Sequence, residues 1–264
     1  MTKRRVVLLA LSMCLLCIVA LSQGLYTESK VKGGPLGDNG ILTRTYFMPK
    51  MFRSENDRDS KAMIFRLDKQ MVYEVDASDK TYSEMTFEQF EATMKKMNSK
   101  MEAKMAELKK NMANMPPEQR KMMEQMMAGQ ALGTDKSAKV DVVKSDEKKE
   151  IAGYSSTKYT VTEDGKETIS LWATKDIKSF NSMKKDFEEY TKRFVASTNQ
   201  SMKSLATEFQ KVDGFPMQMT FTNGISQEVQ KVEQQSVPSS QFEVPEGYTK
   251  VKSRLQEAGE KSND

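Results

Sequence analysis

The sequence predicts an α+β protein in which helices gather on one side of an antiparallel sheet. Three observations indicate this class: short segments of alternating apolar residues come first, a long stretch with helical spacing follows, and a second block of strands contains a further helical stretch. Helices that arrive between blocks of antiparallel strands are typical of this arrangement. The sequence has no glycine-rich phosphate loop and no alternating βαβ pattern, so it does not indicate a nucleotide-binding fold.

The first 22 residues have the pattern of a secretory signal peptide. Residues 3–5 are basic, residues 6–21 form an unbroken run of apolar and small side chains, and Ala20-Leu21-Ser22 supplies the small residues of a cleavage site. We therefore expect an exported protein, periplasmic or extracellular, with the signal peptide cleaved near Ser22. Retention of the run as a membrane anchor is the first alternative, although the run is shorter than the roughly 20 residues that cross a bilayer.

The residues best suited to catalysis near neutral pH are missing from the expected mature chain. Both cysteines, Cys14 and Cys17, lie within the signal segment, and the chain has no histidine. These two residue types supply many nucleophiles, general bases and soft-metal ligands. We therefore predict that the protein is not an enzyme and has no cofactor. Lipidation of one of these cysteines is the second alternative to cleavage.

Charge gives no indication of a nucleic-acid partner. The whole chain has 41 Lys and Arg, 37 Asp and Glu, and a formal net charge of +4. Cleavage would remove three basic residues and no acidic ones, which leaves 38 against 37. Such a balanced, strongly charged surface favours solubility and argues against binding of nucleic acid. We expect residues 23–250 to form one domain without a transmembrane span, followed by a polar tail over residues 251–264.

The first part of the expected mature chain has the pattern of a series of short strands. Apolar and polar residues alternate in five segments, which Asp, Gly and Ser residues separate. We predict an antiparallel meander with one covered face. The segments are residues 25–31, residues 41–48 with a continuation through Pro49 toward Phe52, and residues 61–67, 71–75 and 81–85.

The period changes at Thr86, where Thr86 and Gln89 fit a capping box. Apolar residues then recur every three or four positions, which predicts one helical face about eight turns long. Two prolines at 116–117 interrupt this pattern, and a second, shorter helix is expected to end near Gly129. We therefore predict a helical hairpin over residues 86–129. The apolar positions of the first helix are 87, 90, 94, 97, 101, 105, 108, 112 and 115.

A second block of strands follows residue 139. Its strongest turn signals are Asp164-Gly165 and Asn223-Gly224, each of which predicts a hairpin. From Ser253 the chain is polar, and we expect it to fray. The predicted bounds are 140–144, 155–163 and 167–174 for three strands, 176–209 for a helical stretch with a break near 197–199, and 217–222 with 225–232 for the last hairpin.

Several segments resemble a known family. Ala62-Met-Ile-Phe-Arg-Leu-Asp68, Val72-Tyr-Glu-Val-Asp76 and Lys80-Thr-Tyr-Ser-Glu84 resemble the strand block of a bacterial secreted family, domain of unknown function 4412. The remaining matches extend the resemblance over most of the mature chain. They are Ile151-Ala-Gly-Tyr154, Lys158-Tyr159, Leu171-Trp-Ala173, Gly214-Phe-Pro216 and Phe242-Glu-Val-Pro-Glu-Gly-Tyr248.

The family is similar to the Lol-type lipoprotein-carrier fold. This resemblance implies a strongly curved antiparallel half-barrel whose concave side is closed by helices, with a cavity that holds acyl chains. The matching motifs are aromatic and turn residues, so they bear on the fold rather than on the chemistry. The chain departs from the family in its methionine-rich first helix pair, which leaves the identity of the ligand open.

Methionine is concentrated in the predicted helical hairpin, since 11 of the 21 methionines lie between Met85 and Met127. Three interpretations are open: the stripe packs on the sheet as core, it lines an adaptable apolar cavity, or its thioethers bind Cu(I) weakly. The cavity candidates are Phe87, Phe90, Met94, Met97, Met101, Met105, Phe180 and Phe187. The Cu(I) candidates are Met122, Met123, Met126 and Met127.

The leading functional hypothesis is a non-enzymatic carrier or binding protein of the cell envelope. It would hold a lipid, a lipoprotein acyl chain or another apolar ligand between the sheet and the helices. The alternative is a structural or partner-binding envelope protein without a small ligand, whose protein partner the sequence does not identify. The two hypotheses differ in the stripe from Phe87 to Met115, which packs on the sheet in the first and projects into solvent in the second.

Overall fold

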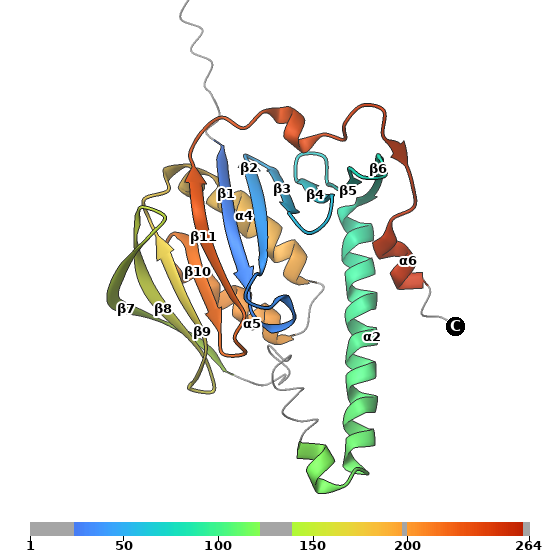
Figure 1. Cartoon of the computed structure of the whole chain (residues 1–264), viewed down its shortest axis with the longest axis vertical. Coiled ribbons are helices and arrows are strands. Elements are labelled where there is room, and N and C mark those ends of the chain that lie inside the picture. The colour runs from blue at the N-terminus through green and yellow to red at the C-terminus, as the bar shows by residue number, and fades with distance from the viewer. Residues whose placement is uncertain (1–23, 122–138, 197–199, 261–264) are drawn as a thin grey trace, which may run out of the picture.

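The computed structural model describes residues 24–121, 139–196 and 200–260 (Figure 1). These residues form a mixed α+β structure with one large antiparallel sheet and helices, which confirms the predicted fold class. The strands are β1 (Leu25–Lys32), β2 (Ile41–Met48), β3 (Met51–Asn56), β4 (Lys61–Arg66), β5 (Met71–Asp76), β6 (Thr81–Thr86), β7 (Val140–Ile151), β8 (Tyr154–Glu163), β9 (Lys166–Thr174), β10 (Phe215–Phe221), β11 (Ser226–Glu233) and β12 (Thr249–Lys250). The helices with assigned bounds are α2 (Phe87–Ala113), α4 (Lys178–Ala196), α5 (Gln200–Phe209) and α6 (Arg254–Glu260), with short 3-10 turns η1 (Gly34–Leu36) and η2 (Ser239–Phe242).

The sheet consists of two meanders joined at one strand pair. Its order is β12-β6-β5-β4-β3-β2-β1-β11-β10-β9-β8-β7, so β1 lies between β2 and the late strand β11. All neighbours are antiparallel except the short pair of β12 with β6. Within the described residues the two edges, β12 and β7, do not pair with each other, so this sheet is open.

The hairpin turns follow from local backbone chemistry. Ala152-Gly153 and Asp164-Gly165 both have positive φ at their two residues, which is the geometry of a tight type I′ hairpin turn. The hairpin predicted at Asp164-Gly165 is therefore confirmed, as is the hairpin of β10 and β11 around Asn223-Gly224. These turns could be predicted because the signal lies in two adjacent residues.

The predicted continuation of the second strand through Pro49 is wrong. The chain reverses at Pro49-Lys50, where Lys50 has a φ of 62°, and Met48 pairs with Met51 of β3. Proline has no backbone N–H to donate to a sheet and is common at turns, so this position ends the strand.

The strand predicted over 140–144 is longer than expected. It extends to Ile151. The prediction stopped at residue 144 because a register shift between Lys144 and Lys148 interrupts the alternation that marks a strand in the sequence.

Helices α2, α4 and α5 pack on the same face of the sheet, and a C-terminal strap, residues 237–248, packs on the other. Phe65 and Ile64 are adjacent in β4 and therefore point to opposite faces. Phe65 contacts aromatic rings from α2 and α4, whereas Ile64 belongs to a cluster with the fully buried Phe242 of the strap. Figure 1 shows α4 and α5 behind the sheet and the strap crossing its upper end.

Helix α2 begins as predicted but leaves the sheet along its length. Thr86 and Gln89 form the predicted capping box, with both reciprocal hydrogen bonds present. Figure 1 shows the far half of α2 extending past the strands. The chain is helical again over 117–121, and the rest of the predicted hairpin lies outside the described residues.

The C-terminal tail was expected to fray from Ser253, but residues 254–260 form α6. Leu255 packs against the cluster around Phe87 and Phe90, and the Ser253 side chain is buried. A single apolar residue in a polar segment was too weak a signal to predict this docking.

In the part of the chain that the structure describes, none of the helices is long and apolar enough to cross a membrane. The predicted signal segment over residues 1–22 lies outside the described residues.

Gly214 lies directly before β10 and has a φ of 121°. A Cβ at this position would lie against the backbone carbonyl of Thr174 in β9, closer than contact distance allows. We expect Gly214→Ala to lower the free energy of unfolding by at least about 2 kcal/mol, measured by urea denaturation.

The matched control is Gly165→Ala, where φ is also positive but a Cβ meets no atom within 4 Å. It should cost only the left-handed backbone strain, about 1–2 kcal/mol. Equal losses in the two variants would show that the close approach of β9 and β10 at Gly214 is not a constraint on the fold.

Candidate functional site

Helix α4 is held on the sheet by a row of aromatic contacts. The Phe180 ring centroid lies 5.1 Å from that of Phe215 on β10. Near the other end of the helix, the Tyr190 ring lies 4.9 Å from Phe52 and 4.8 Å from Phe65. Such tilted and edge-to-face pairs add specific attraction to the burial of large rings. Burial raises the pKa of Tyr190 well above its ordinary value, so its hydroxyl stays neutral.

A cavity of about 510 Å³ lies between α4, α5 and the strands β9 and β10; we call it the helix cavity. Its inner wall is apolar and includes Leu171 of β9, Phe180 of α4 and Val212 after α5, all of which are buried. The remaining lining residues are Lys184, Phe187, Glu188, Thr191, Lys192, Lys203, Ala206, Thr207, Phe209, Gln210, Gly214, Pro216 and Met219.

A second cavity, of about 320 Å³, lies over β1, β2, β3, β10 and β11; we call it the strand cavity. Phe187, Pro216 and Met219 line both cavities, so the two spaces adjoin. Ligand sites in proteins are commonly apolar hollows of roughly 300–1,000 Å³ with a few polar groups. The two spaces together therefore have the size and lining that suit an elongated, mainly apolar molecule.

Part of the floor of the strand cavity is formed by small hydroxyl side chains, beside larger apolar residues such as Val31 and Val229. Thr27 and Thr45 are cross-strand partners in β1 and β2, as are Ser29 and Thr43, and Ser54 of β3 is the partner of Thr45. Where bulky apolar residues would have filled the sheet surface up to α4, these short side chains leave space. Sequence reasoning missed them, although their alternating positions were a usable signal for an inward face that is not tightly packed.

Of the predicted cavity residues, the structure brings together the two on α4. Phe187 lines both cavities, and Phe180 lines the helix cavity. Their spacing of seven residues puts them on one face of the helix, where their rings contact each other at 5.5 Å.

The six predicted residues on α2 lie elsewhere. Phe87 and Phe90 are buried in a cluster with Phe65, and Met94 packs at its edge. Met101 is 61% exposed, so the predicted inward stripe does not stay buried along its whole length. Met97 and Met105 are half-buried, and neither they nor the other four line the helix cavity or the strand cavity. The reason is that α2 packs over β4 to β6, whereas the cavities lie over β1 to β3 and β9 to β11.

The Cu(I) candidates Met122, Met123, Met126 and Met127 lie outside the described residues. Within the described ranges, no group of three or more His, Cys, Asp or Glu side chains is arranged to hold a metal ion.

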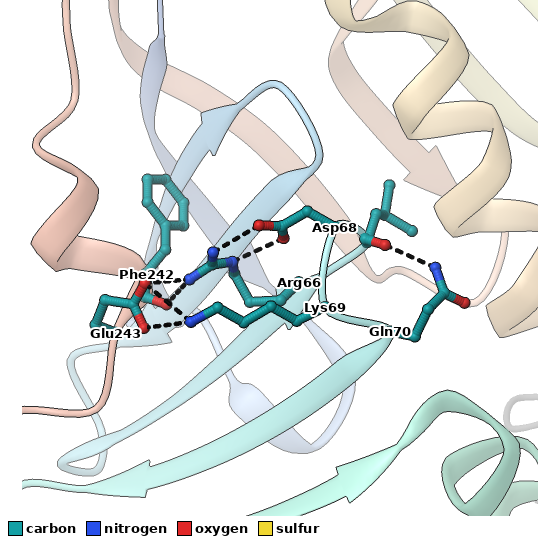
Figure 2. A network of polar contacts seen from close by, with 7 residues as sticks. Arg66, Asp68, Lys69, Gln70, Phe242 and Glu243 are labelled. Atoms are coloured by element: carbon teal, nitrogen blue, oxygen red, sulfur yellow. Dashed lines mark hydrogen bonds and ion pairs between the residues drawn. The ribbon is translucent and has the colours of Figure 1, made fainter.

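A polar latch holds the strap on the face of the sheet opposite the cavities (Figure 2). Arg66 at the end of β4 is only 6% exposed, and it donates to both carboxylate oxygens of Asp68, at 2.8 and 2.6 Å. The same guanidinium donates to the backbone carbonyl of Phe242 at 3.2 Å and pairs with the Glu243 carboxylate, which also accepts from Lys69 at 2.9 Å. A planar guanidinium with fixed donors suits this arrangement better than an ammonium group would.

The electrostatics of the latch favour its charged form. Hydrogen bonding to Asp68 raises the pKa of Arg66, and the hydrogen bond from Arg66 lowers the pKa of Asp68. Burial raises the pKa of Glu243, but hydrogen bonds from Lys69 and Arg66 outweigh it, so its pKa is lowered overall. Because both carboxylate pKa values are lowered on folding, the contribution of the latch to stability is present above about pH 4 and is lost as the pH falls further.

The family model described as domain of unknown function (DUF4412) matches residues 88–248, and the chain belongs to that family. The family resemblance seen in the sequence is thereby confirmed over residues 88–248, which do not include the quoted segments between 62 and 84, and the likeness to lipoprotein carriers stays a prediction. No curated protein matches the chain.

Among solved structures, two of PNGF-II are similar to this chain. The structure in the C2 space group matches 90% of this chain at 9% identity with a TM-score of 0.38, and the structure in the P21 space group matches 90% at 10% identity with a TM-score of 0.39. This chain spans about a third of the PNGF-II chain, 32% and 33% in the two cases. Likeness at this level carries no argument about function.

Substitution of Arg66 tests whether the latch holds the strap. Replacing Arg66 by Gln leaves Asp68, Glu243 and the Phe242 carbonyl without their shared donor. We expect Arg66→Gln to lower the free energy of unfolding by about 1–3 kcal/mol in urea denaturation, because breaking a largely buried charge pair costs more than losing an exposed one. Hydrogen exchange of residues 241–243 should become faster in the same variant.

The control is Arg58→Gln, since Arg58 is an exposed residue in the turn after β3. It should change stability by less than about 0.5 kcal/mol. If both variants unfold at the same urea concentration, the latch does not hold the strap.

Proposed function

We propose that this protein is a non-enzymatic, exported carrier or binding protein that holds a lipid, an acyl chain or a similar apolar ligand in the helix cavity and the strand cavity. The observation that carries the proposal is the helix cavity of about 510 Å³ with an apolar inner wall. Side chains such as Phe209 and Met219 line this space without packing against protein across it, so a ligand that binds there would stabilise the fold.

The composition of the sequence also supports a binding role. The chain has no histidine, and its two cysteines fall within the segment that resembles a signal peptide. Export is part of the proposal and rests on that segment, residues 1–22. A carrier-like half-barrel curvature of the sheet is likewise proposed, because a curved sheet with helices against one face would enclose such a space.

Filling the cavity tests the proposal. Ala206 lies on α5 and lines the helix cavity, so Ala206→Trp puts a large ring where the ligand would bind. We expect the unmodified protein to bind the uncharged fluorescent probe N-phenyl-1-naphthylamine and the variant to bind it at least about tenfold more weakly, a change of about 1.4 kcal/mol.

The control is Ala103→Trp, which introduces the same ring at an exposed position of α2. Circular dichroism should show that both variants keep the secondary structure of the parent. Equal probe binding by all three proteins, or no binding by any, would contradict the proposal.

A structural or partner-binding role is the alternative, and one observation favours it. Helix α2 extends past the sheet and carries Met101 at 61% exposure (Figure 1). Met101 lies four residues from the half-buried Met97 and Met105, so the three side chains share one side of the helix, and a contiguous apolar patch of this kind marks an interaction surface. Cross-linking from a photoreactive residue at position 101 in intact cells would recover a discrete partner under this hypothesis and none under the carrier hypothesis.

A further inference from the structure

We infer that the ligand of the helix cavity is a single-chain anionic amphiphile, with its apolar tail against the sheet and its carboxylate or phosphate head at three lysines on α4 and α5. This inference rests on the proposed function and narrows it to a chemical class of ligand.

The charge at the cavity is mainly positive. Lys184 and Lys192 of α4 and Lys203 of α5 line the helix cavity, together with one carboxylate, Glu188. Glu188 lies four residues from each of the α4 lysines, which is the spacing of neighbours on a helix surface. Lys203 comes from the other helix, so lysines stand on both α4 and α5 around the same space. Glu188 offsets only part of this charge. Asp213, which lies between the lining residues Val212 and Gly214, also interacts with Lys184, but it is already paired with Lys175. An anion that enters between the two helices would be attracted from both.

The positions of the lysines relative to solvent suit a head group rather than a buried ion. Lys192 and Lys203 are exposed, whereas Leu171, Phe180 and Val212 on the inner wall are buried. The cavity is therefore charged near water and apolar toward the sheet. A charged group at the outer position keeps part of its hydration, so binding does not require the large cost of burying an ion.

The separation of lysines near solvent from an apolar inner wall favours one class of apolar ligand over the others. A neutral chain would gain from the inner wall but nothing from the lysines, and a cationic amphiphile would meet like charge. An anionic amphiphile gains from both parts of the cavity. The strand cavity adjoins the inner wall at Phe187, Pro216 and Met219, which provides further length for the tail.

The experiment compares ligands that share a tail and differ in head group. Laurate, 1-lauroyl-glycerol-3-phosphate, 1-dodecanol and dodecyltrimethylammonium are each used to displace N-phenyl-1-naphthylamine from the full-length protein. The two anions should displace the probe at concentrations about tenfold lower than the alcohol, and the cation should be the weakest competitor. Whichever anion binds more tightly identifies the head as carboxylate or phosphate; either result supports the inference.

The triple variant K184Q/K192Q/K203Q removes the positive charge while keeping polar side chains. We expect it to bind both anions about tenfold more weakly and the alcohol unchanged, since exposed charge pairs contribute modestly but add over three sites. Raising the ionic strength from about 0.05 M to about 0.5 M should weaken anion binding by the unmodified protein only, because salt screens exposed charges. The matched control K95Q/K96Q/K166Q changes three exposed lysines away from the cavity and should bind all ligands as the parent does.

Two outcomes would overturn the inference, and they are distinguishable. If laurate, lauroyl-glycerol-phosphate and dodecanol displace the probe equally, or if the triple variant binds the anions as tightly as the control does, the anionic head is wrong while a carrier of neutral apolar ligands remains. If the probe itself does not bind to the unmodified protein, the proposed function fails with it.

Discussion

The pairing of β1 with β11 is the constraint on which the rest of this structure depends. Strand β1 comes at the start of the described chain and β11 near its end, and seven residue pairs align them antiparallel. This pairing joins the meander of β1 to β6 and the meander of β7 to β11 into one sheet. Without it, the helix-facing sides of the two meanders would not form one surface, and α4 could not contact Phe52 on one meander and Phe215 on the other.

The cavities arise because that surface is covered unevenly. Aromatic rings of α4 contact Phe47, Phe52 and Phe65 on the sheet. On the neighbouring strands, short hydroxyl side chains such as those of Thr27 and Ser29 do not fill the space next to the sheet. Protein interiors normally pack as densely as organic crystals, and the apolar side chains around these two spaces lack that dense packing on the side that faces the hollow. The strap and its Arg66 latch cover the part of the other face formed by β2 to β6, so both cavities lie on the helix-covered face.

The parts of the fold with local signals could be predicted from the sequence. The capping box at Thr86, the Asp164-Gly165 turn and the period of α2 each depend on residues within a few positions of one another. The pairing of β1 with β11 could not be predicted, because alternation fixes which face a residue takes but not which strand becomes its neighbour. The latch depends on Arg66 meeting Glu243, 177 positions away in the chain, and neither residue is unusual by itself.

The candidate site was predictable only in part, for a related reason. The helical period correctly grouped Phe180 with Phe187, and both line the helix cavity. The same period grouped Met101 with Phe87, but a period does not show where the sheet under a helix ends. Phe87 is buried, whereas Met101 is 61% exposed. The lysines of the cavity were not recognised, because a lysine on an amphipathic helix has the same sequence pattern whether it faces bulk water or the mouth of a cavity.

The most direct test of the central claim, that an apolar chain binds between the sheet and α4–α5, is methionine methyl NMR with a spin-labelled ligand. Met219 lines both cavities, whereas Met101 lies on the exposed part of α2, so the two methyl groups report on the two competing surfaces. Addition of a fatty acid with a nitroxide near the end of its chain should broaden the Met219 methyl signal strongly and leave the Met101 signal unchanged. Broadening of Met101 with Met219 unaffected would contradict the account and place the apolar surface of this protein on α2.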